Sequence, residues 1–361
     1  MRATVYLLTI ILTSSVAAAQ GPAPAATPSV DQLIAQLGAA DAESRAAAAC
    51  LLRARARRAE LAVAALVRLL PDATSTPAVC AFSGFDGTGQ GALLPRTSPG
   101  FEAGVTLGMI GDAAVEPLLR SARNAGRDER RHAIRGLAAV RDARSVGALV
   151  SAARDSDALV RAEAASGLRG RGGDDVQRAL TAMARDTDAN VRARAVQSLG
   201  AYDSQEVTAV LVGALGDQDA SVRAQAATAL GRRRDRGTVP PLIGALQDRD
   251  IGVRIRAVQS LGAVGGPDAV TPLLTILRDT DPELRERAAL ALGRLGDRRA
   301  VSALTTALRD SDPLVRERAA SALGQLRDPG ATDALITSLR DADPDVREEA
   351  TRALGRIERQ R

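Results

Sequence analysis

Aspartate and arginine recur at a fixed spacing along this chain, and their side chains are the most obvious candidates for chemistry. In each copy an Asp lies six positions before an Arg. The seven pairs are Asp155 and Arg161, Asp186 and Arg192, Asp217 and Arg223, Asp248 and Arg254, Asp279 and Arg285, Asp310 and Arg316, and Asp341 and Arg347. The planar guanidinium group of Arg reaches two acceptors at once. We therefore expect each pair to hydrogen-bond within its own unit or to the next one, forming a ladder along the fold.

Other chemistry has little support in the sequence. The copies contain Asp-x-Asp, which can bind a metal ion, but seven regular copies favour a structural role because a catalytic site needs only one. His132 is the only histidine, so a cluster of His ligands for zinc is impossible. No Gly-x-Ser-x-Gly motif accompanies it, and no pair of carboxylates stands out as acid and base. We therefore predict no catalytic residues, no metal site and no cofactor.

The elements that position these pairs belong to a tandem repeat. Strings such as DTDPELRERAALALG (279–293) and DSDPLVRERAASALG (310–324) are copies of one motif, and its Arg recurs every 31 residues from 161 to 347. Apolar residues at helical spacing lie between the motifs. Each unit thus predicts two helices of roughly 12 residues and two short turns. Counting weaker upstream copies, we expect about ten helix pairs over residues 30–358, stacked into an all-α solenoid because no single pair can bury both apolar faces.

Each motif also contains residues that begin and end its second helix. Asp343 can accept hydrogen bonds from the first free N–H groups, and Pro344 fits the first turn. Gly324 falls near the other end, where either a left-handed C-cap or close helix packing requires a residue without Cβ. The motif therefore predicts both boundaries of the second helix.

Composition and the N-terminal residues indicate an exported helical protein. Hydrophobic residues make up 45% of the 361 residues and aromatic residues 1%, so the core must consist of Ala, Leu and Val. Residues 1–19 are typical of a signal peptide, with Arg2, a short apolar run and a small-residue cleavage site. A retained anchor helix is the alternative. Residues 20–29 read as a linker, and we expect a periplasmic or secreted protein with no membrane insertion after cleavage.

The charge of the chain is modest and evenly spread. The formal net charge is +5, and every basic residue is Arg. Acidic and basic residues alternate instead of forming a basic block, so nucleic acid is not an expected partner. We expect a monomer whose partner is another protein.

The motif resembles a known repeat family. The pattern DxDPxVRxxAAxALG, followed by Gly-Asp-x-x-Ala-Val-x-x-Leu, is similar to HEAT repeats of the phycobilisome-lyase type. This resemblance covers nearly all of the chain after the signal peptide. It implies an armadillo-like, right-handed superhelix with the second helices on the concave side, and roles from bilin attachment to scaffolding. Deoxyhypusine hydroxylases resemble this fold but carry paired His-Glu motifs for two irons, which a chain with one His does not match.

The repeat phase breaks between Arg45 and Arg130, which are 85 positions apart and therefore not a whole number of units. An irregular insertion at 71–100, rich in Gly, Pro, Ser and Thr, lies in this gap. Long irregular loops and large aromatic side chains are both common at interfaces. The chain's three Phe residues lie in or beside the insertion, where they either bind a partner or form a small local core: Phe82, Phe85 and Phe101.

We expect the exposed row of the concave face two places after the motif Arg. This row varies while its neighbours stay Ala or Leu, as exposed positions on a shared scaffold do. Its members are His132, Glu163, Arg194, Gln225, Arg256, Arg287, Arg318 and Glu349. Within it, Arg256, Arg287 and Arg318 would form a continuous positive strip. An acidic segment of a partner is our hypothesis for its ligand, and a solvated face without a ligand is the alternative.

The chain contains two cysteines, Cys50 and Cys80, and an exported protein with two cysteines favours a disulfide. With Arg45 as a motif Arg, Cys50 faces the concave side. Cys80 lies in the segment that replaces the start of the neighbouring second helix. We predict that the two pair and hold the insertion against the concave face, with two unpaired thiols as the alternative.

Two classes of function remain. The first is a non-catalytic interaction scaffold of the bacterial cell envelope, which presents a concave helical surface and an aromatic-bearing loop to a protein partner. The second is a lyase-like or regulatory subunit that binds a small molecule or a bilin-type chromophore. The expected export favours the first, because bilin attachment in the family is cytoplasmic.

Overall fold

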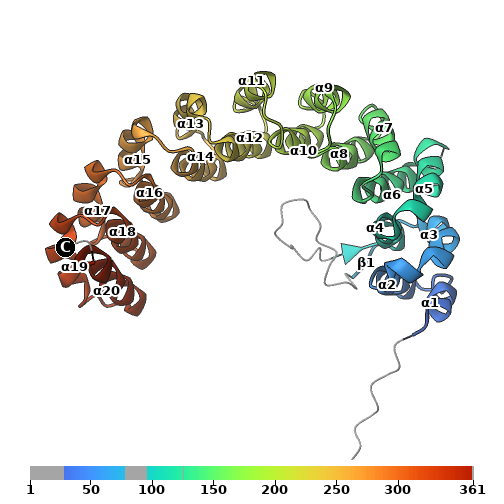
Figure 1. Cartoon of the computed structure of the whole chain (residues 1–361), viewed down its shortest axis with the longest axis horizontal. Helices are drawn as coiled ribbons and strands as arrows, with labels where there is room; N and C mark the ends of the chain where they lie inside the picture. Colours follow the sequence, from blue (N-terminus) through green and yellow to red (C-terminus); the bar gives the residue numbers. More distant parts are fainter. Residues whose placement is uncertain (1–27, 78–95, 125, 360–361) are drawn as a thin grey trace, which may run out of the picture.

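The computed structural model describes residues 28–77, 96–124 and 126–359. Within these ranges the chain contains twenty α-helices in ten consecutive pairs, and its only strands are the short antiparallel pair β1 (Thr76–Pro77) and β2 (Arg96–Thr97). The helix pairs stack side by side into an arch, with the first and last pairs at its two ends (Figure 1). The all-α solenoid expected from the repeat is confirmed.

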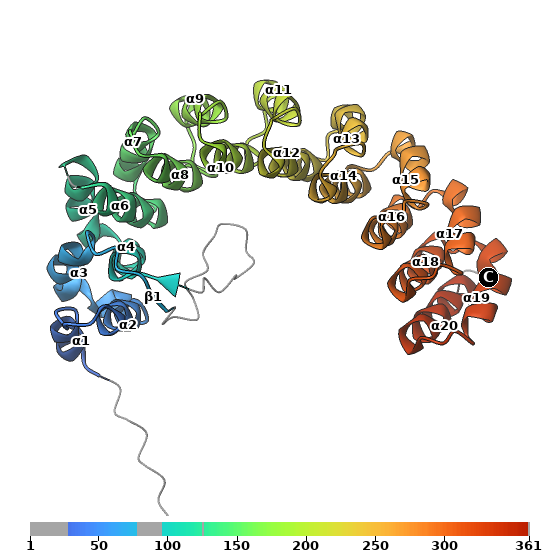
Figure 2. The same ribbon diagram turned by 180° about the vertical axis from the view of Figure 1, so that it is seen from behind.

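The two helices of a pair lie on opposite sides of the arch, and both views agree on this (Figures 1 and 2). The first helices form the convex side: α1 (Val30–Gln36), α3 (Val63–Leu69), α5 (Asp112–Asn124), α7 (Ala143–Ala152), α9 (Asp174–Met183), α11 (Gln205–Ala214), α13 (Val239–Ala245), α15 (Val270–Ile276), α17 (Val301–Ala307) and α19 (Thr332–Ser338). The second helices form the concave side: α2 (Ala42–Arg53), α4 (Pro99–Ile110), α6 (Arg127–Ala139), α8 (Ala158–Gly167), α10 (Ala189–Leu199), α12 (Ala220–Arg233), α14 (Ile251–Val264), α16 (Pro282–Leu295), α18 (Pro313–Leu326) and α20 (Pro344–Glu358). The concave side is therefore built from the helices that carry the repeated motif.

Most convex helices are shorter than the roughly 12 residues expected from the repeat. The last four have seven residues each, because a 3-10 turn occupies the start of the element. In three of these turns an Asp accepts a hydrogen bond from the backbone N–H two residues on, as Asp297 does from Arg299. The 3-10 segments are η1 (Ala56–Arg58), η2 (Glu60–Ala62), η3 (Arg236–Thr238), η4 (Pro267–Ala269), η5 (Arg298–Ala300) and η6 (Pro329–Ala331).

Concave helices begin where the motif predicts. Asp343 caps α20 by accepting hydrogen bonds from the N–H groups of Asp345 and Val346, and Pro344 is the first helical residue. Asp281 and Asp312 cap α16 and α18 in the same way, again followed by Pro. A side-chain cap of this kind stabilises a helix by about 1 kcal/mol. The capped turns fix where each concave helix starts relative to its neighbour.

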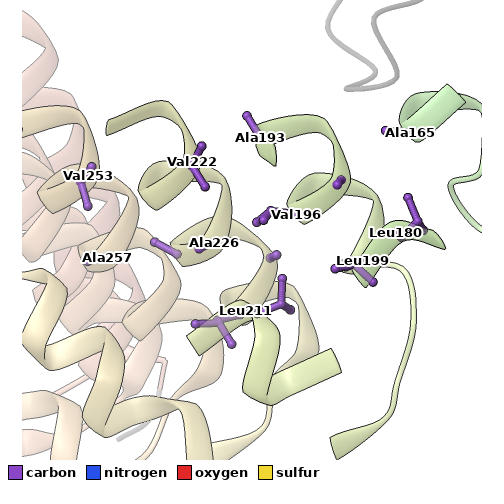
Figure 3. Packing of buried hydrophobic residues seen from close by; sticks show 14 of the residues in the cluster. Ala165, Leu180, Ala193, Val196, Leu199, Leu211, Val222, Ala226, Val253 and Ala257 are labelled. Carbon is purple, nitrogen blue, oxygen red and sulfur yellow. The ribbon is translucent and has the colours of Figure 1, made fainter. Parts of the chain in front are cut away.

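The core between the two layers consists of Ala, Leu and Val. Figure 3 shows Val196 and Leu199 of α10, Leu211 of α11 and Ala226 of α12 meeting in this layer, and all four are fully buried. Small residues let the concave helices approach one another closely. A Cβ placed on Gly324 would lie 2.8 Å from the Cα of Ala353 on the next concave helix. Gly324 lies inside α18, so close packing, and not a C-cap, explains the glycine of the motif.

The region of the predicted insertion differs from an ordinary turn. Ser98 caps α4, which begins at Pro99, so the last part of the 71–100 stretch is already helical. Strand β1 pairs Thr76 with Thr97 of β2. The predicted signal peptide (1–19), most of the linker (20–29) and residues 78–95 lie outside the part of the chain that the structure describes. In the part that it does describe, no helix is both long and apolar enough to cross a bilayer.

Candidate binding surface

The Asp–Arg pairs join consecutive repeats. Arg192 uses Nε and Nη2 to donate to the two carboxylate oxygens of Asp217, both at 2.8 Å. Its Nη1 donates to the backbone carbonyls of Asp186 at 2.9 Å and Thr187 at 3.1 Å, in the turn of its own unit. Each such Arg therefore fixes its own turn and binds the Asp of the next unit. The same bidentate pairing occurs in Arg130–Asp155, Arg161–Asp186, Arg223–Asp248, Arg285–Asp310 and Arg316–Asp341.

One rung of this ladder is missing between α14 and α16. Arg254 donates through Nη1 to the carbonyl of Asp248 at 3.0 Å, but its buried Nε has no partner among the described residues. Asp279, the expected acceptor, accepts from the backbone N–H of Asp281 at 2.9 Å, a bond that the paired Asp residues also make. Arg347, in the last repeat, bonds only the carbonyls of its own turn. The ladder is thus continuous from Arg130 to Asp248 and again from Arg285 to Asp341.

The ladder carboxylates are held in their ionised form. Burial raises the pKa of Asp217, but hydrogen bonds from Arg192 and from the N–H of Asp219 lower it by more, so the pKa lies below its ordinary value. For Asp248 the hydrogen bond from Arg223 is the largest cause of a lowered pKa. The pKa values of Asp155, Asp186, Asp310 and Asp341 are lowered as well.

These shifts predict a steep loss of stability in acid. A carboxyl with a lowered folded pKa stabilises the fold above its unfolded pKa, about 3.9 for Asp. That contribution disappears as the pH falls from there through the folded value, because the unfolded chain then binds more protons. Urea unfolding between pH 6 and pH 2.5 should show this fall below pH 4. Buried His132, whose pKa is lowered by burial, adds a shallower decline that begins below about pH 6.5.

Two variants separate the ladder from general charge effects. Asp217→Asn removes a paired carboxylate, so the variant should lose less stability on acidification than the wild type. Asp279→Asn removes the same charge at the missing rung, where no Arg pairs with the carboxylate among the described residues, so comparing the two variants isolates the effect of the Arg pairing. Equal slopes in both variants would contradict the assignment.

Three members of the expected exposed row are in fact buried. His132 is 2% exposed, and Glu163 and Glu349 are 6% exposed. The Nδ1 atom of His132 lies 2.8 Å from the carbonyl oxygen of Leu70. Glu163 pairs with Arg135 of α6, and Glu349 pairs with two Arg residues of its own helix. The expectation of exposure was wrong at these positions because each side chain has a partner that covers it.

The expected positive strip is interrupted by the chain's own carboxylates. Arg287 lies 3.2 Å from Glu283. Arg318 lies 3.3 Å from Glu286 and 3.0 Å from Glu317. Arg256 is exposed and bonds only the neutral amide of Gln259, at 3.2 Å. Among these three residues, Arg256 is the one without a carboxylate partner in the described ranges.

A different set of cations gathers at the centre of the arch. Helices α10, α12 and α14 contain no Asp or Glu between their first and last residues. On α12 the residues that are not buried form one stripe, which includes Gln225, Thr228 and Arg232. The other sides of this helix contact α10, α14 and the convex layer, so the stripe faces the concavity. We define the central face as the equivalent stripes of these three helices, with Arg194, Arg232 and Arg256 as its cations.

Sequence reasoning missed Arg232. It lies seven positions after Gln225, two turns along the same helix face, so helical periodicity from the expected row would have found it. Burial lowers the pKa of Arg232, and so does the positive charge of Arg169 and Arg256. Arg232 therefore lies near two other cations.

The aromatic candidates do not form a binding site in the described chain. Phe101 lies in α4, is 8% exposed, and packs with its ring 4.3 Å from the guanidinium carbon of Arg135. Its burial agrees with the local-core alternative expected for the Phe residues. Phe82 and Phe85 lie outside the described residues.

Only one of the two cysteines lies among the described residues. Cys50 lies in α2 and is half-buried. Cys80 lies outside the described residues. The disulfide therefore stays a prediction.

Hollows for small molecules are limited in the described chain. Two of them have volumes of about 230 Å³ and 290 Å³. Pockets that enclose a drug-sized ligand usually measure about 300–1,000 Å³. The first lies between α17 and α19, and the second is lined by residues of η3, η4 and the turn before η5. Neither lies on the central face, and neither favours a chromophore site.

Comparison with known proteins agrees with this geometry. The family model described as HEAT repeats matches five overlapping stretches, residues 115–200, 146–221, 179–238, 208–280 and 270–355. No curated protein matches the sequence.

Several solved structures share the fold. The Escherichia coli protein YibA is 24% identical, with a TM-score of 0.55 over 71% of this chain and 95% of its own. Kap95p, in a structure with RanGDP, is 14% identical, with a TM-score of 0.61 over 92% of this chain and 51% of its own. Importin beta is 15% identical, with a TM-score of 0.58 over 92% of this chain and 56% of its own. The chain thus spans about half the length of these last two proteins.

Proposed function

The chain belongs to the HEAT-repeat family, and we propose that it is a non-catalytic scaffold that holds a protein partner on its concave surface. The central face carries this proposal. Its polar side chains run across three consecutive repeats, and its cations lack carboxylate partners in the described chain. Kap95p, which has the same fold, was solved with RanGDP, so an arch of this kind can hold another protein.

We also propose a cellular localisation for the protein. Residues 1–19 have the charge, apolar run and small residues of a signal peptide, so we place the protein in the bacterial cell envelope, periplasmic or secreted. A scaffold suits that setting because it needs no cofactor or energy source. The partner would then be another exported protein or the exported part of a membrane protein.

Reversible capture tests the proposed function. The purified protein is immobilised and exposed to a cell-envelope extract of its source organism, and a retained protein is then purified and mixed with it in solution. We expect a complex of fixed stoichiometry that dissociates with both masses unchanged. A covalent change in the retained protein would indicate catalysis and contradict the proposal, as would the absence of any stoichiometric complex.

Export and disulfide formation make a joint prediction. Intact-mass analysis of the protein secreted by a bacterial host should show cleavage after Ala19. The same sample, kept unreduced, should react with no thiol reagent, because Cys50 and Cys80 are paired. Cys50→Ser is the control and should expose one reactive thiol. Two reactive thiols in the unreduced wild type would contradict the disulfide, and an uncleaved N-terminus would contradict the signal peptide.

A further inference from the structure

We propose that the central face binds an extended, acidic segment of the partner protein, with Arg194, Arg232 and Arg256 contacting its carboxylates. This inference rests on the proposed function and specifies the chemistry of the partner. It also relocates the acidic-segment site expected from the sequence, from α14, α16 and α18 to α10, α12 and α14.

The three cations of the central face are available to a ligand. Arg194 donates to the neutral oxygens of Asn190 at 3.1 Å and Ser166 at 2.9 Å. Arg256 donates to Gln259. No hydrogen bond or ion pair holds Arg232 in the part of the chain that the structure describes. An arriving carboxylate therefore displaces at most neutral partners.

The flanking parts of the concave side already contain carboxylates of the chain that pair with arginine. On the N-terminal flank, Glu163 pairs with Arg131 and Arg135. On the C-terminal flank, Arg287 and Arg318 pair with carboxylates of α16 and α18. Over the central face, whose helices contain no Asp or Glu, an acidic ligand meets no competing carboxylate on the same helices, and charge complementarity directs it there.

The positive charges around Arg232 repel one another. Arg232 lies close enough to Arg169 and Arg256 for both charges to lower its pKa. Bound carboxylates would relieve this repulsion. Within the described chain, neither Arg232 nor Arg256 has a carboxylate partner of its own that would offset this repulsion.

The spacing of the arginines sets the length of the partner segment. Arg194 and Arg256 occupy equivalent positions two repeats apart. Packed helices lie about 8–10 Å apart, so the two Cα atoms are separated by roughly 16–20 Å. An extended chain covers about 3.3 Å per residue, and about six residues therefore span the face. The amides of Gln197, Gln225 and Gln259 lie on the same stripes and can bond the backbone of such a segment.

Other anionic ligands fit the face less well. Binding of single-stranded nucleic acid usually depends on aromatic side chains that stack on the bases. Helices α10, α12 and α14 contain none. The face lies inside the arch (Figure 2), where a flat bilayer cannot reach it. A flexible protein segment needs no aromatic stacking partner and can enter the arch.

A direct binding experiment tests this inference. The probe is a fluorescein-labelled peptide of eight residues with Glu at every third position and Gly or Ser between. Fluorescence anisotropy at about 50 mM salt should show saturable binding that weakens as salt screens the charges. Arg194→Glu/Arg232→Glu/Arg256→Glu should weaken binding by about thirtyfold or more, since each exposed ion pair contributes a few-fold and each reversal adds repulsion.

The control variant changes the same charge elsewhere. Arg185→Glu/Arg278→Glu/Arg309→Glu reverses three exposed arginines in the turns between a convex helix and the next concave one, and it should weaken binding less than threefold. Arg194→Ala/Arg232→Ala/Arg256→Ala adds no repulsion and should weaken peptide binding by about tenfold. This variant keeps the test valid if the triple Glu variant does not fold. Circular dichroism verifies that each variant is folded.

Several results would overturn the inference. One is that the peptide does not bind, and another is that the face and control variants lose the same affinity for it. A third is that the same face binds a 20-nucleotide single strand or phosphatidylglycerol vesicles more tightly than the peptide. The proposed function is tested separately. If the captured partner binds the face variants as tightly as the wild type, the acidic-segment inference fails while the scaffold function stands.

Discussion

Replacing Arg192 by alanine is expected to lower the free energy of unfolding of its repeat by about 3–5 kcal/mol, because it leaves the mostly buried carboxylate of Asp217 without its partner. Arg192 is 6% exposed. It makes four hydrogen bonds, two to Asp217 and two to carbonyls of its own turn. The substitution therefore uncouples two repeats and loosens a turn at the same time.

Arg254→Ala is the matched control. Arg254 occupies the same motif position, but its one hydrogen bond goes to the carbonyl of Asp248. Removing it should cost about 1 kcal/mol. Solenoids unfold by units coupled to their neighbours, so hydrogen exchange of the turns after α9 and α13 is measured along with urea midpoints. Equal destabilisation by the two substitutions would show that the inter-repeat rung contributes nothing.

Replacing Gly324 by alanine should also destabilise the fold, by about 1–3 kcal/mol, although alanine is the better helix former. The added Cβ would lie 2.8 Å from the Cα and 2.9 Å from the Cβ of Ala353. Backbone atoms cannot move aside independently, so α18 and α20 must separate, and overpacking of this kind has that cost. The effect should appear in thermal unfolding as a lower midpoint.

A glycine in an open position provides the opposite expectation. Gly213 lies inside α11, and no atom lies within 4 Å of a Cβ built on it. Gly213→Ala should therefore stabilise the protein, by up to about 1 kcal/mol, through helix propensity alone. If both substitutions shift the midpoint in the same direction, close approach of the concave helices is not what selects glycine in the motif.

The repeat made much of the fold predictable. The 31-residue phase located the helix pairs from Arg130 onward, and weaker upstream copies completed the ten. The capping residues located the starts of the concave helices. For the ladder, the phase left two arrangements open, within a unit or to the next one. The structure has the second for the side-chain pairs, as in Arg161 and Asp186. Local patterns with a fixed period determine these features, so one sequence is enough to infer them.

Features that depend on neighbouring repeats were not predictable in this way. Glu163 is buried because Arg135 of the preceding repeat reaches it. Arg318 is neutralised partly by Glu286, 32 positions earlier. The missing rung at Arg254 has no signature in the sequence, because both Arg254 and Asp279 are present. Side-chain pairing across repeats decides which charges remain available, and that pairing varies while the motif does not.

A photo-crosslinking amino acid placed on the two sides of the arch tests the central claim most directly. Gln225 lies on the concave stripe of α12, and Glu206 is exposed on the convex helix α11. Each position in turn receives the crosslinker, and the captured partner is irradiated with each protein and analysed by mass spectrometry. A scaffold that binds on its concave surface gives partner adducts from position 225 and none from position 206. Adducts from position 206 with none from position 225 would contradict it.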